Sequence, residues 1–189
     1  MTTTAVFAEI LVVGLQATVW LALLCLWIAD VNGIPVGRVA AKAGALKEWA
    51  TLITTFVLGF AYTLGIIVDR LADSIQSSIE KALSTKREPD KSVPPRRLRV
   101  MKDSPEITKL LEYFRTRMRI ARSTSLNLLL TTLAAVLIAR HAGCYWILMI
   151  VGTGLALVVV ATFVSRRIAK TYDERLGEAY DLVTSAKTS

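Results

Sequence analysis

Residues 142–165 read AGCYWILMIVGTGLALVVVATFVS and contain no charged side chain. Three more stretches of this kind precede them: residues 50–68 and 123–139 carry no charge, and residues 5–29 carry only Glu9. An α-helix rises about 1.5 Å per residue, so about 20 apolar residues match the roughly 30 Å hydrocarbon core of a bilayer. Water-soluble proteins rarely contain four such runs. The sequence therefore predicts an all-α membrane protein with four transmembrane helices.

The composition of the 189-residue chain agrees with this class. Hydrophobic residues make up 53% of it, the mean hydropathy is +0.49, and the formal net charge is +8 with a pI near 9.8. In a soluble protein such a positive charge would suggest nucleic-acid binding. Here the positions of the charges are more informative than their sum.

The basic residues lie mostly on one side of the four apolar runs. With four spans, the amino terminus, residues 69–122 and residues 166–189 share a side, and they hold 19 of the 23 Lys and Arg residues; the other side holds 4. Lys and Arg accumulate in cytoplasmic segments. We therefore expect both termini in the cytoplasm.

Helix breakers and apolar spacing divide the chain into eight segments. Ser104-Pro105-Glu106 is a typical helix start, with a capping residue, a proline and an acid. Apolar residues at helical spacing continue the second, third and fourth helices beyond the membrane, so their extensions are expected to form a cytoplasmic helical bundle. The expected segments are transmembrane helix 1 (1–29), an outer loop (30–49), helix 2 with its cytoplasmic extension (50–83), a basic Pro-containing linker (84–104), a cytoplasmic helix continuing into helix 3 (105–139), an outer turn (140–143), helix 4 (144–165) and an amphipathic cytoplasmic tail (166–189).

A polar stripe follows the second helix through the predicted membrane. Its members share one face at 100° per residue, and they are Thr51, Thr55, Tyr62 and Asp69. Asp73, Gln76 and Glu80 continue the stripe beyond the apolar run. Polar side chains inside a bilayer must face protein or water. The stripe therefore indicates either the lining of a pore or a seam of helix packing, in which Gly59 and Gly65 would allow close approach.

The first helix repeats this pattern with two polar residues that are seven positions apart, Glu9 and Gln16. An ionisable group inside a membrane span is a functional candidate, although Glu9 is also close enough to the end of its run to reach headgroup water. The pore-lining candidates of the two helices are Glu9, Gln16, Thr51, Thr55, Tyr62 and Asp69.

Charges of both signs gather where the second helix leaves the predicted membrane and the third enters it. Asp69 and Asp73 on the second helix and Arg119 and Arg122 on the third are candidates for salt bridges that control a gate. Arginines at this boundary also fit snorkelling and the positive-inside rule. Their alignment on one face favours phosphate binding through guanidinium groups. The candidates for an anionic ligand, such as a nucleotide or oligonucleotide, are Arg96, Arg97, Arg99, Arg115, Arg119 and Arg122.

The sequence has no motif of an enzyme or a metalloprotein. It has no nucleotide-binding loop and no nucleophile motif, and the single histidine, His141, has no metal-site spacing to Cys25 or Cys144. We therefore expect no catalytic residue, metal or cofactor. The two cysteines would lie near the outer helix ends, as small apolar-segment residues or, in an oxidising compartment, as a disulfide.

The predicted plan of the chain is four spans, a cytoplasmic amino terminus, a long basic loop between the second and third spans, and a cytoplasmic tail. This plan, with AYTLGIIVDRLAD at 61–73 and RTRMRIAR at 115–122, resembles four-helix bacterial membrane effectors of anti-phage defence. These include the Hailong-system channel subunit, the Kiwa membrane protein and pore-forming CRISPR-associated proteins. The resemblance implies a channel in the inner (plasma) membrane of a bacterium that depolarises the cell. Animal large-pore channels look similar in plan, but the outer-loop cysteine pattern of the connexin type is absent. Four-helix multidrug transporters also place a Glu in the first span, but their loops are shorter.

The leading hypothesis is a homo-oligomeric membrane channel, of three or more subunits, gated by its basic cytoplasmic region. Its partners would be the lipid bilayer, further copies of itself and an anionic cytoplasmic ligand. The alternative is a non-conducting membrane sensor or anchor that recruits a soluble cytoplasmic partner protein. A third hypothesis is a proton-coupled small transporter that uses Glu9. None of the three is an enzyme.

Overall fold

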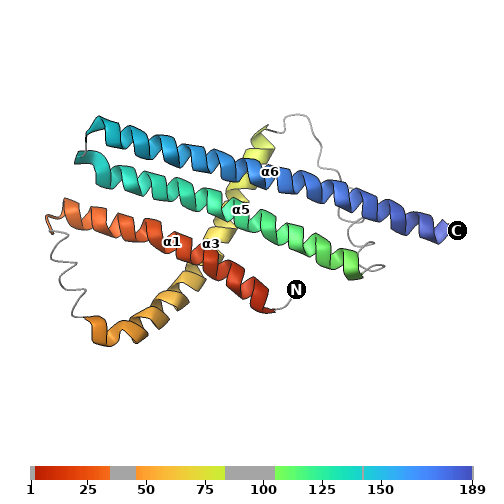
Figure 1. Ribbon diagram of the computed structural model, residues 1–189, viewed down its shortest axis with the longest axis horizontal. Helices are drawn as coiled ribbons and strands as arrows, with labels where there is room; N and C mark the ends of the chain where they lie inside the picture. Colours follow the sequence, from red (N-terminus) through yellow and green to blue (C-terminus); the bar gives the residue numbers. More distant parts are fainter. Residues whose placement is uncertain (1–2, 35–45, 84–104, 142, 189) are drawn as a thin grey trace.

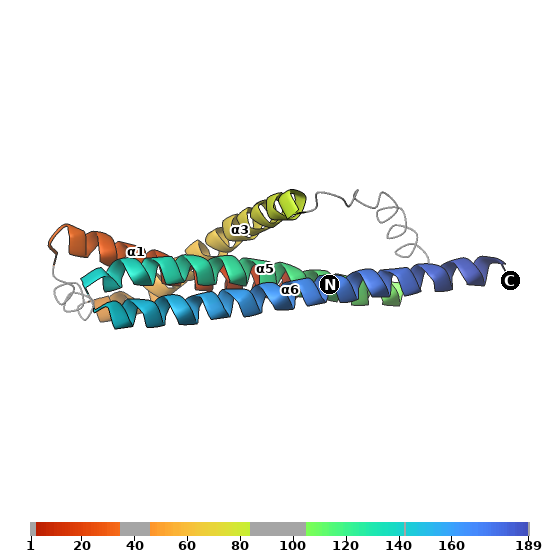
Figure 2. The ribbon, with the colours of Figure 1, turned by 90° about the horizontal axis from the view of Figure 1, so that it is seen from above.

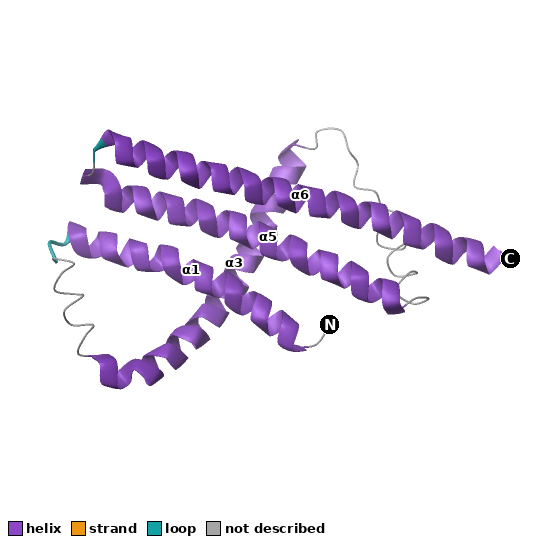
Figure 3. Cartoon of the chain, viewed as in Figure 1, coloured by secondary structure: helices purple, strands orange, loops and turns teal. Residues whose placement is uncertain are grey.

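The structure is a computed structural model that describes residues 3–34, 46–83, 105–141 and 143–188. Nearly all of these residues are helical, as Figure 3 shows, so the predicted all-α class is confirmed. The basic linker expected at 84–104 and residues 35–45 of the expected outer loop lie outside the described residues. The elements are α1 (Thr3–Val31), η1 (Leu46–Trp49), α3 (Ala50–Leu83), α5 (Pro105–Ile138), η2 (Ala139–His141) and α6 (Cys144–Thr188).

Four of these helices are long and apolar enough to cross a membrane. The segments are Val6–Val31, Ala50–Ile79, Ile107–His141 and Cys144–Asp181. In their most apolar windows at most 17% of residues are buried, and large side chains such as Phe56 (76% exposed) remain open. Because a soluble fold would bury side chains of this kind, the surface is consistent with a membrane protein.

The ends of the helices follow from local sequence. Gly33, at a φ of +69°, ends α1: its N–H donates to the Asp30 carbonyl at 3.0 Å, and the Ile34 N–H donates to the Ala29 carbonyl at 2.9 Å. This pair of bonds is the Schellman motif, which needs a left-handed residue that glycine adopts without steric cost. The helix α5 begins at Pro105, where proline has no N–H to leave unpaired.

Three helices lie side by side in a row, and α3 crosses behind them at an oblique angle (Figure 1). The helix α5 lies between α1 and α6, and the view from above shows α3 diverging from the row (Figure 2). Within the described part of the chain, α6 packs against α5 and does not contact α1 or α3. The N-terminal end of α1 and the C-terminal end of α6 point to the same end of the row (Figure 1).

The helices α1 and α3 meet at a crossing that only small residues allow. A Cβ added to Gly14 would lie 1.6 Å from the carbonyl oxygen of Ala61, and one added to Gly65 would lie 2.0 Å from that of Ile10. Ala17 and Ala61 at this crossing are completely buried. Of the two glycines expected to allow close approach, Gly65 lies in this crossing, whereas a Cβ on Gly59 would meet open space.

The 45 residues of α6 span about 68 Å, roughly twice the thickness of a bilayer core. Its C-terminal part packs against the start of α5 around Leu111, Leu176 and Ala179, with Ile107, Tyr172 and Tyr180 at the edge of this cluster. Two of the three expected extensions therefore pack together. The third, on α3, is joined to α5 by the ion pairs described below and then diverges from the row (Figure 2).

Candidate functional site

The polar stripe of α3 divides into three parts with different surroundings. Thr51 and Thr55 are exposed, and the Thr55 hydroxyl donates to the Thr51 carbonyl at 3.0 Å. Tyr62 stacks on Phe7 of α1 with ring centroids 5.0 Å apart. Asp69 is buried and faces α5. One side of the helix is thus open at its start, packed on α1 at Tyr62 and ion-paired with α5 two turns farther along, at Asp69.

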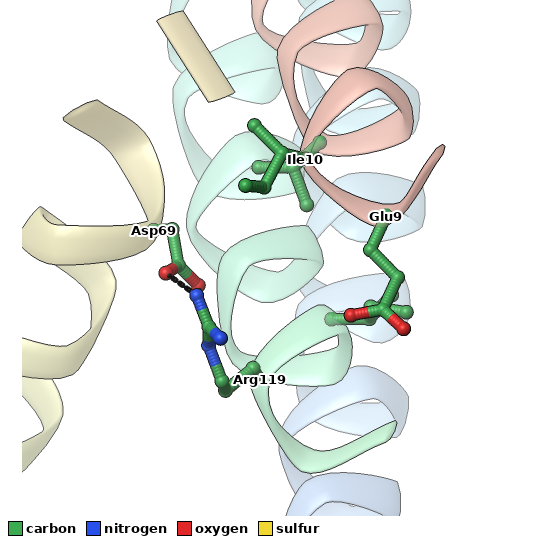
Figure 4. A pocket seen from close by; sticks show the side chains of 6 residues that line it. Glu9, Ile10, Asp69 and Arg119 are labelled. Atoms are coloured by element: carbon green, nitrogen blue, oxygen red, sulfur yellow. Dashed lines mark hydrogen bonds and ion pairs between the residues drawn. The ribbon is translucent and has the colours of Figure 1, made fainter. Parts of the chain in front are cut away.

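The ion pair joins Asp69 of α3 to Arg119 of α5, as Figure 4 shows. The guanidinium donates through Nη2 to Asp69 Oδ2 and through Nε to Oδ1 at 3.4 Å, and the Ser123 hydroxyl donates to Oδ1 at 3.3 Å. The Asp69 side chain is only 10% exposed. One turn farther along, Arg122 Nη1 lies 3.5 Å from Asp73 Oδ1. The structure thus brings together all four residues that the sequence suggested as a gate.

The two ion pairs differ in their surroundings, and therefore in strength. Loss of the cation from a buried pair costs about 3–5 kcal/mol, because an uncompensated charge stays behind. The Asp69 side chain is well buried but Arg119 is 36% exposed, so solvent brings this pair below that limit. The Asp73 side chain is 42% exposed, where solvent reduces a pair to about 0–1 kcal/mol. Asp69–Arg119 is therefore the stronger link between α3 and α5.

A chain of uncharged polar groups continues this link along α5. The Asn127 side chain is buried; its Nδ2 donates to the Val13 carbonyl at 3.0 Å, and its Oδ1 accepts from Trp20 Nε1 at 3.1 Å. The Thr124 hydroxyl donates to Gln16 Oε1 at 3.1 Å. We call this set the polar seam, made of Gln16, Trp20, Thr124 and Asn127. It places Gln16, a pore-lining candidate, in the interface between α1 and α5.

Glu9 lies near the same ion pair on the α1 side. Together with Ile10 and Val13 of its helix it borders a cavity of about 10 Å³ against Asp69 and Arg119 (Figure 4). This volume is close to the minimum that holds one water molecule. Glu9 therefore sits at the charged end of the helices, the end marked by Asp69 and Arg119.

An open cleft separates α3 from α5 just beyond the ion pairs. Its volume is about 390 Å³. Four arginines and two aspartates dominate its lining, and of these Arg70 and Arg115 are exposed and make no ion pair with any described residue. The lining residues are Asp69, Arg70, Asp73, Ser77, Arg115, Met118, Arg119 and Arg122.

The cleft contains part of the anion-binding set that the sequence suggested. Arg115, Arg119 and Arg122 line it, whereas Arg96, Arg97 and Arg99 lie outside the described residues. Arg70 was not among the candidates, because a single arginine after an apolar run looks like a topology signal.

Sequence reasoning also missed Ser123 and Asn127. Their spacing of four residues, continuing from Arg119, was a signal for one polar face on α5.

The opposite end of the helices carries a smaller polar group. Arg140 donates through Nη2 to Asp30 Oδ2 at 3.2 Å and through Nε to His141 Nε2 at 2.9 Å. These contacts tie the end of α1 to the turn between α5 and α6. Cys25 and Cys144 are both exposed and free, so the structure contains no disulfide between them.

Comparison of the chain with protein families, with curated proteins and with solved structures gave no match.

Proposed function

We propose that the chain is an integral protein of the bacterial inner membrane, with four spans and both termini in the cytoplasm. We propose further that it forms a homo-oligomeric channel opened from its charged end, as an effector that depolarises the cell in anti-phage defence. The apolar exposed helices and the 19-to-4 distribution of basic residues support the membrane topology. The resemblance in plan to four-helix defence effectors motivates the proposed role in defence.

The observation that carries the gating proposal is the way α3 is held. It is attached at the small-residue crossing with α1 and by the Asp69 and Asp73 ion pairs with α5. Its N-terminal third, residues 50–60, is exposed throughout. The ion pairs follow the crossing by one to two turns, so a change at Asp69 acts on α3 next to its fulcrum and can tilt the free N-terminal part of the helix. We infer that α3 is the gating element and that Asp69–Arg119 is its latch.

The free N-terminal part of α3, residues 50–60, also supports assembly of several subunits. It carries the hydroxyls of Thr51, Thr54 and Thr55, and a bilayer tolerates such a face best against protein or water. In an oligomer of three or more subunits with α3 nearest the axis, Thr51 and Thr55 would line the conducting path.

The experiment expresses the full chain in bacteria and follows the membrane potential with a potential-sensitive dye. Asp69→Asn breaks the latch and should raise the leak above that of the wild-type chain. The double variant Asp69→Arg/Arg119→Asp restores opposite charges at the same place and should return the leak toward the wild-type level. The matched control, Lys170→Gln/Glu174→Gln, removes an exposed ion pair of α6 and should change nothing, because such pairs contribute little.

Unchanged potential in every variant, with the proteins present in the membrane, would contradict the channel. The non-conducting sensor would then be the better proposal. It has an observation of its own in its favour, the packed α5–α6 extension around Leu111 and Leu176, which offers a surface to a soluble partner.

A further inference from the structure

We propose that the cleft between α3 and α5 binds a phosphate-bearing molecule that bridges the two helices. The consequence for gating rests on the proposed channel function, whereas the binding itself requires only the described cleft. The site uses Arg70 of α3 together with Arg115, Arg119 and Arg122 of α5.

The charge of the cleft favours an anion. Its lining holds four arginines against two aspartates, and the aspartates are engaged by Arg119 and Arg122. This leaves Arg70 and Arg115, one on each helix, with no ion pair among the described residues. A ligand of opposite charge in the cleft would be attracted by both guanidinium groups. Guanidinium groups suit phosphate, because their planar fork donates two parallel hydrogen bonds to its oxygens.

The size of the cleft indicates a phosphate attached to a larger body. Its volume of about 390 Å³ exceeds the need of one inorganic anion and falls within the roughly 300–1,000 Å³ of small-molecule sites. Met118 adds an apolar contact to the lining, and the Ser77 side chain adds a hydroxyl oxygen that can accept a hydrogen bond. A phosphate on a soluble compound and the phosphate of an anionic lipid headgroup share this chemistry.

The position of the cleft couples binding to the latch. Phosphate oxygens that reach Arg119 or Arg122 compete with Asp69 and Asp73, the groups by which α3 is attached to α5. Arg70 then attaches α3 to the ligand, so a direct link between the helices becomes a ligand-bridged one. A ligand shifts such an equilibrium only through its different affinity for the two arrangements. Here the difference arises from exchanging carboxylates for phosphate on the same arginines.

The test measures binding to the full-length protein in lipid nanodiscs, with a soluble and a lipid probe in separate arms. The first arm titrates inorganic pyrophosphate calorimetrically into protein in phosphatidylcholine nanodiscs. The second arm measures the enrichment of phosphatidylglycerol around the protein in mixed nanodiscs by native mass spectrometry. The cleft variant Arg70→Gln/Arg115→Gln is compared with Arg166→Gln/Arg167→Gln, which removes the same charge from exposed positions of α6, away from the cleft.

We expect the cleft variant to lose about tenfold or more in affinity for one of the probes, the effect of removing charge-assisted hydrogen bonds. The α6 variant should bind like the wild-type protein. Asp73→Asn, which removes a competing carboxylate from a half-exposed pair, should raise the affinity up to about fivefold. Loss of pyrophosphate binding identifies a soluble phosphate compound, and loss of phosphatidylglycerol enrichment alone identifies a lipid headgroup.

Two results would overturn the site: a wild-type protein that binds neither probe, or an α6 variant that loses as much affinity as the cleft variant, since net charge alone would then explain the binding. The channel is judged separately, because binding is measured without conduction. Specific binding to a protein that never conducts would refute the channel and leave the cleft as a ligand site. Conduction without specific binding would support the channel and refute the cleft as a ligand site.

Discussion

At the scale of single residues, polar side chains determine which helices are joined. Asn127 has both ends of its amide occupied on α1, by the Val13 carbonyl and by the Trp20 indole. Asp69 has both carboxylate oxygens occupied on α5. Such bonds are specific in an apolar environment, because few other partners are within reach of an isolated polar group.

The first residue-scale prediction concerns Asn127. Replacing it by Ala removes its three hydrogen bonds with α1, to the Val13 carbonyl, Gln16 Oε1 and the Trp20 indole. It leaves the Trp20 N–H without its acceptor, so the protein should lose about 1–2 kcal/mol of stability. Unfolding of the purified protein by increasing sodium dodecyl sulfate in mixed micelles measures this loss.

Thr54→Ala is the control for that substitution. The Thr54 hydroxyl donates to the Ala50 carbonyl of its own helix at 2.8 Å, and its removal breaks no contact between helices. Equal stability losses in the two variants would mean that the polar seam does not hold α1 to α5.

At the scale of elements, α3 is the helix with the most uneven packing. Backbones of α1 and α3 approach so closely at Gly14 and Gly65 that a single Cβ would overlap a carbonyl of the other helix. Toward its N-terminus the same helix exposes every residue from 50 to 60. This contrast explains why its position depends on one crossing and on the ion pairs that follow it.

The element-scale prediction is therefore a matched pair of glycine substitutions in α3. Gly65→Ala forces α1 and α3 apart at Ile10 and should destabilise the protein by about 1–3 kcal/mol, the usual cost of overpacking. Gly59→Ala meets open space and should be neutral or stabilise by up to about 1 kcal/mol, because alanine is the better helix former. Thermal unfolding in detergent compares the two. If Gly59→Ala proves as harmful as Gly65→Ala, the crossing is not where the backbones meet.

At the scale of the whole molecule, the extent of the exposed apolar surface is consistent with a membrane protein. Side chains such as Phe56, Trp146 and Val159 are all more than half exposed. In a bilayer, lipid covers such surface without cost, so exposure alone does not distinguish a lipid-facing helix from one that faces another subunit. The threonines of α3 make that helix the better candidate for contact between subunits.

The whole-molecule prediction uses cysteine cross-linking in membranes, after both native cysteines, which are exposed and free, have been replaced by Ala. Phe56→Cys on the N-terminal half of α3 should form cross-links between subunits, because that half would lie nearest the axis. Val159→Cys on α6, which is similarly exposed, should form few. Gel electrophoresis without reductant shows the products. A reversed order would place α6 at the subunit contact and remove α3 from the axis.

The sequence by itself determined the elements of this protein. Four apolar runs are sufficient to predict four long helices, because helix length and hydrophobicity depend on neighbouring residues alone. The helix expected at 50–83 is α3, and α5 starts at Pro105 because proline acts on the residues next to it. The sequence likewise located the charged residues that meet where the apolar run of α3 ends, since their order along each helix gives their depth.

Only the tertiary structure decided which residues of different helices touch. The sequence placed Asp69 and Arg122 at the same depth, yet Asp69 bonds to Arg119, and Arg122 lies against Asp73. It could not assign Gln16 to the seam with α5, and it gave Gly59 and Gly65 equal weight. Helical periodicity relates residues around one axis only. The rotation and crossing angle of a second helix come from how closely the backbones approach, which here depends on Gly14 and Ala61 together.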